Sequence, residues 1–463
     1  MEKPKNAFKG HCLVVPYPTP GHINPMLQFS RRLEHRGVKV TLAVTEYIFK
    51  TMQDVAFSSI SVETFSDGKV ADVETDIQDY LVRLQENGTK TLTKLVEKLC
   101  ASDDDHNDPL ICIVYDSFLP WALDVARKFR LVSAVFLTQS ASVSNIYYHV
   151  WNGSLRLPLS ESSRVFIPGL PPLEASETPS FLHIYGSYPA IREFLVDQFK
   201  NFHQADWIFF NTFYKLEEKV VDWMTKNWPM VRTIGPTLAS MLMDKRINED
   251  KDYVLNCYNP NTDSCMKWLN ERPDSSVAYV SFGSIAELGK EQFQELAWGL
   301  KNSNVYFLFV VRSKEQSKLP KGFLEENSKS EKGLVVSWCP QLKVLEHKAL
   351  GCFVTHCGWN STLEALSFGV PVVAMPQWSD QITNAKFIDN VWGNGVKAAR
   401  TNDSGLITRE EVEFLLKEVM EGEKGEEIRK NASKWKELAK EAVDEGGSSD
   451  EAINEFVANI VGY

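Results

Sequence analysis

The sequence contains no apolar run that approaches the length of a membrane-spanning helix. The run VPVVAM (370–375) has the length of one buried strand, whereas a helix that crosses a bilayer needs about 20 apolar residues. The first residues, MEKPKNAFKGHC, also lack the apolar core of a secretory signal. We therefore expect a cytoplasmic protein with no stable membrane insertion.

The sequence has fewer basic than acidic residues. Its 50 Lys and Arg residues and 61 Asp and Glu residues give a formal net charge of -11. A protein that binds nucleic acid through its phosphates needs a basic face, and one that is held at an anionic membrane needs a cluster of Lys and Arg. The charge balance argues against both classes, and we expect no nucleic acid among the partners.

The chain lacks any CxxC pair, and its 8 cysteines in 463 residues are an unremarkable number. Cys352, His356 and Cys357 lie close together in the sequence, but their spacing fits no usual pair of zinc ligands. Cys12 and Cys112 lie inside apolar strand patterns, where a free cysteine behaves as a small hydrophobic residue. We expect no metal site and no cofactor.

The chain does contain strand-like apolar runs that alternate with amphipathic helical patterns, which is typical of a parallel α/β sheet. A chain of this length is also too long for one core. In the first half we predict strands over residues 11–17, 38–45, 59–65, 110–116, 133–138 and 206–212. In the second half we predict strands over residues 275–284, 304–312, 334–339, 352–357 and 370–376.

The pattern predicts two doubly wound domains, over residues 1–240 and 263–443, with a polar linker at 241–262 and a C-terminal helix at 444–463. Residues 151–190 are rich in Pro, Ser and Gly and predict a long loop region, which is usually functional. Ligands of such sheets bind beyond the carboxyl ends of the strands. With two sheets, the cleft between the domains is the expected active site.

The stretch THCGWNSTLEAL (355–366) changes from a strand pattern to a helical pattern that starts at Leu363. The start of a helix has unpaired N–H groups and the positive end of the helix dipole. Gly358 would allow the backbone to approach a ligand, and Asn360, Ser361 and Thr362 could cap the helix or donate hydrogen bonds. This combination suits a phosphate, although an ordinary capped helix explains it equally well.

Three further stretches of the second half follow strands. SFGSIAE (281–287) could wrap a phosphate with Ser284, and PQWSDQ (376–381) ends in a polar pair suited to sugar hydroxyls. In WCPQ (338–341) the Trp could stack on a flat ring and the Gln could bond a sugar. Core packing or surface polarity would explain each stretch alone, but their joint placement after consecutive strands indicates one binding site.

In the first half, PYPTPGHINP (16–25) follows the first strand and places His22 where a helix would begin. A helix N-terminus disfavours imidazolium, so we expect a neutral His that can act as a base. A packed turn His remains the alternative. Asp116 ends another strand and could fix the imidazole tautomer from the same sheet edge. No GxSxG stretch is present, which argues against a serine hydrolase.

These stretches together resemble the plant family-1 UDP-dependent glycosyltransferases. The region from Trp338 to Gln381 is similar to the signature box of that family throughout, and FGS (282–284), PGHINP (20–25) and the strand that ends in Asp116 match as well. The resemblance covers the whole chain. It implies an α/β protein with two facing Rossmann-like domains (GT-B type), an inter-domain cleft, and a C-terminal helix that crosses back to the first domain.

The resemblance also implies roles for individual residues. His22 resembles the general base and Asp116 its partner. The implied UDP contacts are Ser284, Trp338, Cys339, Gln341, His356, Asn360, Ser361 and Glu364. The implied donor-sugar contacts are Thr138, Trp359, Asp380 and Gln381, with the indole of Trp359 turned toward the sugar. Gln381 resembles the glucose-using members, and Thr19 is implied to position donor or acceptor.

The expected activity is therefore inverting, metal-independent transfer of glucose from UDP-glucose, the co-substrate, to a small lipophilic plant metabolite. The acceptor group is a hydroxyl or a carboxyl. Details of the chain resemble the branch that glucosylates salicylate-type carboxylates, thiohydroximates, or triterpenoid and steroid alcohols; flavonoids and other phenolics also remain open. The alternatives are a UDP-sugar hydrolase or epimerase of related fold and a non-catalytic nucleotide-sugar-binding module. We expect a monomer.

Overall fold

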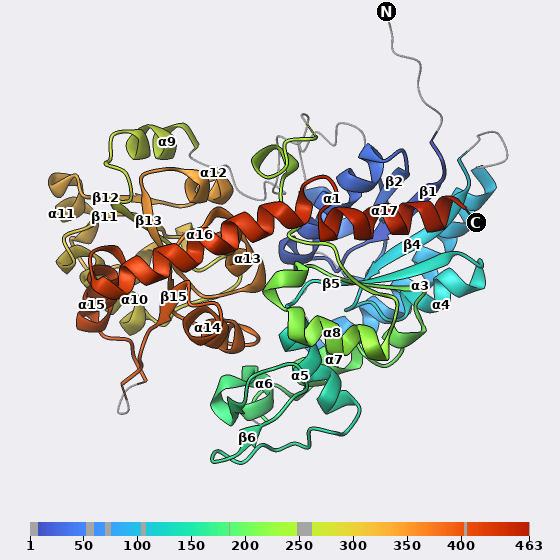
Figure 1. Cartoon of the computed structure of the whole chain (residues 1–463), viewed down its shortest axis with the longest axis horizontal. Helices are drawn as coiled ribbons and strands as arrows, with labels where there is room; N and C mark the ends of the chain where they lie inside the picture. Colours follow the sequence, from blue (N-terminus) through green and yellow to red (C-terminus); the bar gives the residue numbers. More distant parts are fainter. Residues whose placement is uncertain are drawn as a thin grey trace, which may run out of the picture. The chain divides into compact units, whose positions relative to one another are not determined.

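The computed structural model describes residues 8–51, 60–69, 76–102, 108–184, 186–247, 262–401 and 405–462. The chain forms two compact units (Figure 1). Unit 1 contains Met1–Ala175, Phe181–Cys257 and Lys440–Tyr463, and unit 2 contains Ser176–Ser180 and Tyr258–Ala439. Most of the linker predicted at 241–262 lies outside the described residues.

Unit 1 is built on a seven-stranded parallel sheet in the order β3-β2-β1-β4-β5-β8-β9. Its strands are β1 (His11–Val15), β2 (Lys39–Thr45), β3 (Ser61–Phe65), β4 (Leu110–Asp116), β5 (Val132–Leu137), β8 (Trp207–Phe210) and β9 (Val231–Thr233). They are mostly buried apolar runs, as expected of strands covered on both faces. The strand order reverses between β1 and β4, which makes the carboxyl ends of these strands the expected ligand site.

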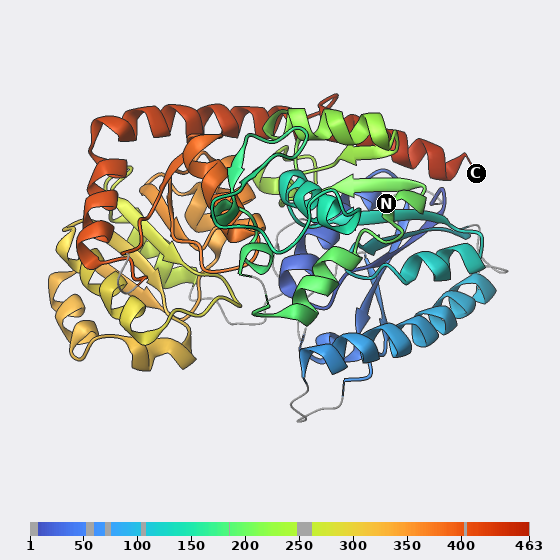
Figure 2. The same cartoon turned by 90° about the horizontal axis from the view of Figure 1, so that it is seen from below.

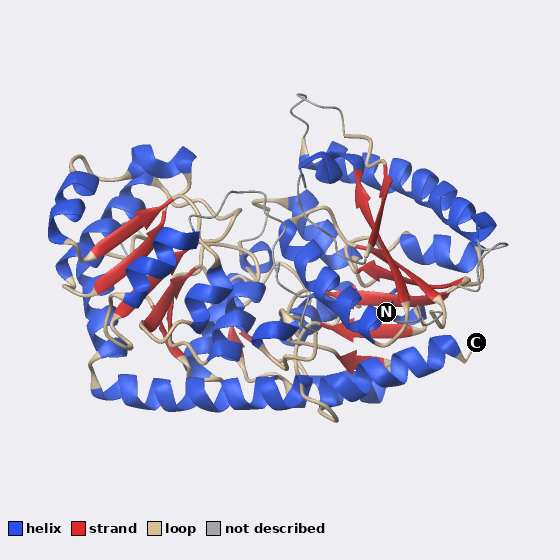
Figure 3. Cartoon of the chain, turned by 90° about the horizontal axis from the view of Figure 1, so that it is seen from above, coloured by secondary structure: helices blue, strands red, loops and turns tan. Residues whose placement is uncertain are grey.

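Helices cover both faces of this sheet, and α3 and α17 lie on opposite faces (Figures 2 and 3). The helices of unit 1 are α1 (Pro20–His35), α2 (Glu46–Thr51), α3 (Ile77–Ser102), α4 (Ala122–Lys128), α5 (Ala141–Trp151), α7 (Pro189–Asp197), α8 (Glu218–Asn227) and α17 (Ser448–Val461). Short 3-10 helices add η3 (Phe202–Gln204), η4 (Tyr214–Leu216) and η5 (Ser240–Leu242).

The last helix, α17, completes the core of unit 1. Ile453, Phe456 and Ile460 recur at helical spacing and are almost fully buried against the core that contains Phe29 and Phe209. Without this helix, the apolar residues around Phe29 would lose part of their cover. Its burial therefore makes the C-terminal helix an integral part of unit 1.

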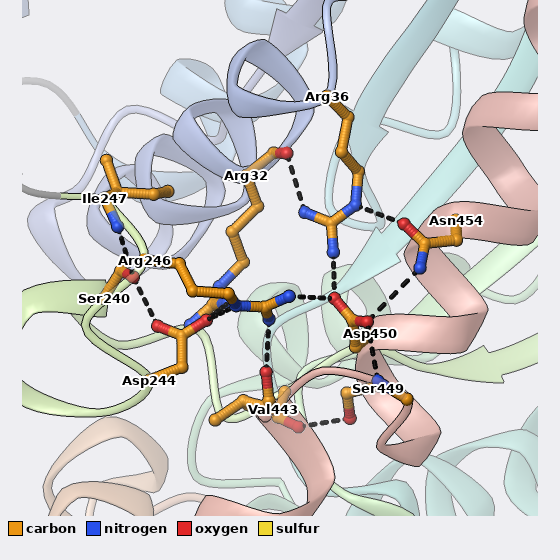
Figure 4. Close-up of polar contacts among 12 residues, drawn as sticks. Arg32, Arg36, Ser240, Asp244, Arg246, Ile247, Val443, Ser449, Asp450 and Asn454 are labelled. Atoms are coloured by element: carbon orange, nitrogen blue, oxygen red, sulfur yellow. Dashed lines mark hydrogen bonds and ion pairs between the residues drawn. The ribbon is translucent and has the colours of Figure 1, made fainter.

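An ion-pair network fixes the start of α17 (Figure 4). Asp450 in its first turn accepts hydrogen bonds from Arg36 of α1 and, at 2.9 Å, from Arg246. Arg246 also donates to Asp244 at 2.7 Å, and Arg32 of α1 donates to the same carboxylate at 3.0 Å. Both carboxylates are 2% exposed. The network therefore joins α1 to the C-terminal helix through buried charges.

Unit 2 is built on a six-stranded parallel sheet in the order β12-β11-β10-β13-β14-β15. Its strands are β10 (Val277–Ser281), β11 (Tyr306–Val310), β12 (Gly333–Val336), β13 (Leu350–Thr355), β14 (Val372–Ala374) and β15 (Gly395–Lys397). The helices are α9 (Thr262–Asn270), α10 (Lys290–Asn302), α11 (Phe323–Ser330), α12 (Gln341–Glu346), α13 (Trp359–Phe368), α14 (Gln381–Asn390), α15 (Arg409–Met420) and most of α16 (Glu423–Val443), with η6 (Ser313–Lys318). The strand order reverses between β10 and β13.

The sequence prediction of two parallel α/β sheets is confirmed, and each predicted strand coincides with an observed one. Two strands of these parallel sheets, β9 and β15, were not predicted. The prediction of a long loop over 151–190 was wrong in part, because this stretch forms a short hairpin and helical turns. These are β6 (Arg164–Val165), β7 (Leu173–Glu174), η2 (Ala175–Glu177), α6 (Ser180–His183) and the start of α7.

Residues 176–180, which the sequence placed in the first domain, group with unit 2. The contacts explain this. Ser180 and Ser379 exchange two hydrogen bonds, of 3.0 and 2.6 Å. Lys386 of α14 lies 2.7 Å from the Glu177 carboxylate, and Thr383 donates to the Glu177 carbonyl at 2.8 Å. Polar side chains of α14 therefore hold this short segment.

Candidate active site

His22 and Asp116 form a closely paired dyad in unit 1. His22 lies in the first turn of α1, directly after β1, and Asp116 is the last residue of the adjacent strand β4. The two atoms His22 Nδ1 and Asp116 Oδ2 are 2.7 Å apart. Asp116 is fully buried, and its second oxygen accepts the Phe118 amide at 2.9 Å. The carboxylate thus fixes the imidazole with Nδ1 as donor, and Nε2 carries the lone pair.

Two threonines support the position of His22. Thr19 is the residue before α1, and its carbonyl accepts the backbone N–H groups of His22 and Ile23, both at 3.0 Å. Thr138 follows β5 and its Oγ1 lies 3.0 Å from His22 Nδ1. Thr138 therefore contacts the ring nitrogen that faces Asp116. Nε2 makes no hydrogen bond within the described part of the chain, so it is available as a proton acceptor.

Aromatic side chains surround the imidazole. The ring of His22 lies 4.7 Å from Phe118 and 5.3 Å from Tyr17, measured between centroids. Phe194 of α7 packs against both of these rings, at 5.0 and 5.6 Å. Burial, and then the charges of Asp116 and Asp67, raises the pKa of Tyr17, so its hydroxyl stays protonated. The surroundings of the base are apolar and aromatic, which suits a lipophilic molecule.

In unit 2, His356 lies between β13 and α13 and packs closely against two glycines. A Cβ added to Gly358 would lie 2.6 Å from His356 Nε2, and one added to Gly283 would lie 2.9 Å from His356 Cε1. Burial, with a smaller effect of the Arg312 charge, lowers the pKa of His356 to about 4. The ring is therefore neutral at pH 7. Gly358, which the sequence assigned to ligand approach, makes room for this ring.

The helix that follows begins earlier than predicted. α13 starts at Trp359 rather than at Leu363, and its N-cap is Gly358, without a side-chain cap. Asn360 and Ser361 therefore lie in the first helical turn and do not cap it. Trp359 is 4% exposed, and its indole lies 6.0 Å from that of Trp392. The indole is therefore packed within unit 2, and the expected contact of Trp359 with the donor sugar stays a prediction.

A second polar cluster joins the WCPQ stretch to α13. Gln341 Nε2 donates to Glu364 at 2.6 Å and to Ser361 at 3.2 Å. Tyr279 of β10 donates to Gln341 Oε1 at 3.0 Å and accepts from Cys339 at 3.3 Å. Burial raises the pKa of Tyr279, so the phenol remains a donor. The structure thus brings together four of the predicted UDP contacts, and it adds Tyr279, which has no motif signal because it lies inside a strand.

Asp380 and Gln381 mark the start of α14. Asp380 accepts from the Asn384 side chain at 2.9 Å, and Asn384 also donates to the Cys357 carbonyl at 3.0 Å. Gln381 Oε1 accepts two backbone N–H groups, from residues 377 and 378. Asn384, which sequence reasoning missed, therefore ties Asp380 to the segment that carries His356. Trp338 and Ser284 are both half-buried. Trp338 follows β12, and Ser284 lies in the loop between β10 and α10.

The comparison with known proteins decides the family. Residues 240–442 match the UDP-glucoronosyl and UDP-glucosyl transferase family. UDP-glycosyltransferase 74F2 of Arabidopsis thaliana is 48% identical over 461 residues, which are 98% of each chain. The chain belongs to the UDP-glycosyltransferase family. It is therefore an enzyme that transfers a glycosyl group from a UDP-sugar.

Two further relatives of this UDP-glycosyltransferase are a named glucosyltransferase and a solved structure with bound UDP. The flavonol 7-O-beta-glucosyltransferase UGT74F1 of Arabidopsis thaliana is 46% identical over 466 residues, which cover 99% of both chains. The crystal structure of Os79 from O. sativa in complex with UDP has a TM-score of 0.89 at 38% identity and covers 97% of this chain and 100% of that chain. Os79 has also been solved in complex with U2F and trichothecene. This similarity confirms the GT-B fold class.

None of the helices of this UDP-glycosyltransferase is both long and apolar enough to cross a membrane, as far as the structure describes the chain. Within the same residues, no group of three His, Cys, Asp or Glu side chains is arranged to hold a metal ion.

Proposed function

We propose that this UDP-glycosyltransferase transfers glucose from UDP-glucose to a hydroxyl of a small lipophilic molecule, with inversion at the anomeric carbon. The observation that carries the proposal is the His22–Asp116 pair, joined at 2.7 Å with Nε2 open beside aromatic rings. A base in this state is suited to remove the proton from a hydroxyl as its oxygen attacks.

In the proposed reaction, His22 Nε2 takes the acceptor proton while the acceptor oxygen forms a bond to the anomeric carbon. The bond from that carbon to the phosphate oxygen breaks on the opposite face, and UDP leaves with the electron pair. The imidazolium formed at His22 is stabilised by the buried carboxylate of Asp116. The positioned base is expected to contribute about 10²–10⁴-fold.

We assign UDP to unit 2. The start of α13, with neutral His356 and the Asn360 and Ser361 side chains, offers N–H donors and a positive dipole end to the diphosphate. Trp338 would stack on uracil. The Gln341–Glu364 pair would bind the uridine, with the Glu364 carboxylate accepting from the ribose hydroxyls. Stabilisation of the leaving UDP would then come from this helix start.

We infer glucose as the sugar for two reasons. Gln381, in the Asp380–Gln381 pair at the start of α14, resembles the residue of glucose-using members. The relative UGT74F1 is also named as a glucosyltransferase. The acceptor class follows from the rings of Tyr17, Phe118 and Phe194 around the base. Flavonols and trichothecenes, which the names of the relatives contain, are lipophilic hydroxylated molecules of this kind.

A direct test is mass spectrometry of the purified protein incubated with UDP-glucose and an acceptor panel of flavonoids, phenolic acids, triterpenes and steroids. We expect a hexose adduct on one acceptor class, and alkali treatment will distinguish a glucose ester from a glucoside. UDP-glucose that is consumed without any acceptor would instead favour a hydrolase. Tight UDP binding without product from any UDP-sugar would favour a non-catalytic binding module.

The packing of His356 gives a prediction for the donor site. We expect Gly358→Ala to weaken UDP binding roughly tenfold, because the added Cβ meets the imidazole at 2.6 Å and would push the ring out of its place. Gly289→Ala is the matched control, since nothing lies within 4 Å of its Cβ position. Calorimetric titration with UDP measures both variants. An unchanged UDP affinity in Gly358→Ala would remove His356 from the proposed diphosphate site.

A further inference from the structure

Three basic side chains from the segment after β11 bind the loop that follows β10. Arg312, two residues after β11, donates to the carbonyls of Ser284 and Ala286. Lys318 donates to the Leu288 carbonyl at 2.8 Å, and Lys314 pairs with the Glu287 carboxylate. The segment from 312 to 318 therefore contacts nearly every residue of the loop over 284–288.

This pattern orients the peptide groups of the loop. The carbonyl and the N–H of one peptide unit point in opposite directions, because the unit is planar and trans. With the carbonyls of Ser284 and Ala286 turned toward Arg312, the N–H groups of Ile285 and Glu287 point away from it. Ile285 is 58% exposed, so the loop reaches the solvent at this residue. A cation on the carbonyl oxygens also polarises these peptides and makes their N–H groups better donors to an anion.

The side chain of Arg312 is buried and held in one orientation. It is 6% exposed, and its Nε donates to the equally buried Glu315 carboxylate at 2.7 Å, which fixes the plane of the guanidinium. Its charge also acts on His356, whose pKa it helps to lower. Gly283, next to Ser284, lies against the His356 ring. Arg312 thus lies behind the two segments to which the diphosphate of UDP is assigned.

We propose that Arg312 is a positioning residue for the diphosphate of the donor, acting through the Ser284–Ala286 loop. Its two forked bonds hold this loop with the amides and the Ser284 hydroxyl facing the phosphates, and its charge stabilises the charge on the leaving UDP. This inference rests on the proposed function, because it assumes that the Ser284 loop contacts UDP.

The test compares UDP with uridine, which lacks the phosphates, by calorimetric titration. We expect Arg312→Met to weaken UDP binding roughly 10- to 100-fold, as for loss of charge-assisted hydrogen bonds, while uridine affinity stays within about twofold. Arg312→Lys keeps the charge but loses the fork, so its loss of UDP affinity should be smaller. Arg409→Met is the control. In the part of unit 2 that the structure describes, Glu295 is the side chain to which Arg409 is hydrogen-bonded, and no bond joins Arg409 to the Ser284 loop.

Each outcome separates the possible roles. Equal losses of UDP and uridine affinity would show that Arg312 only maintains the fold, and an unchanged UDP affinity would also overturn the inference. If Arg312→Met does not fold, Arg312→Lys decides by the same comparison. A wild-type protein that binds UDP no more tightly than uridine would instead refute the proposed diphosphate site itself.

Discussion

We expect replacement of His22 by alanine to lower glucosyl transfer to an alcohol acceptor by about 10²–10⁴-fold while UDP affinity stays unchanged. The geometry explains this separation of effects. His22 lies in unit 1 with its Nδ1 on Asp116 and its Nε2 open, whereas the residues assigned to UDP lie in unit 2. Steady-state kinetics with a non-acidic alcohol, together with calorimetric titration of UDP, measure the two quantities.

The acidity of the acceptor provides an internal control. A carboxylic acid acceptor is already ionised at neutral pH and needs no base, so its transfer rate should fall much less in His22→Ala than that of an alcohol. Asp116→Asn should also slow transfer to the alcohol, because an amide no longer stabilises the imidazolium and can favour the wrong tautomer. An equal loss of rate for both acceptor types would show that His22 is structural rather than the base.

The partners of this base show how far the sequence could predict the site. His22 and Asp116 are 94 residues apart, yet their pairing was predictable, because both follow strong strand patterns and parallel strands share one edge for their carboxyl ends. Phe194 carried no such signal, since it lies on helix α7, which contains no motif and follows no predicted strand. Only the packing of α7 brings this ring to Tyr17 and Phe118.

In unit 2 and in the short strands, too, some features depend on packing and have no signal in the sequence. Tyr279 donates to Gln341 of the WCPQ stretch and Arg312 donates to the Ser284 carbonyl, at separations of 62 and 28 residues. These contacts arise from tertiary packing, which the sequence alone did not reveal. β9 and β15 have three residues each and become strands by pairing with β8 and β14. Such short runs have no periodicity of their own.

The second large effect is expected on stability. Asp450→Asn should destabilise unit 1 by about 3–5 kcal/mol, because removal of one charge from a buried ion pair leaves its partners uncompensated. The side chain of Asp450 is 2% exposed and contacts Arg36 and Arg246. In the network of Figure 4, Arg246 would keep Asp244 as a carboxylate partner, whereas Arg36 would keep none. Urea unfolding followed by fluorescence, with UDP absent, measures the loss.

A matched control lies on the same helix. Glu455 of α17 pairs with Arg232 through two bonds of 2.7 Å, but its side chain is 51% exposed, so Glu455→Gln should cost at most about 1 kcal/mol. The two substitutions change the same chemical group on the same helix and differ mainly in burial. Equal small losses would show that water reaches the network and screens it. A large loss in Asp450→Asn alone would show that α1, which also carries His22, depends on the buried charges at the start of α17.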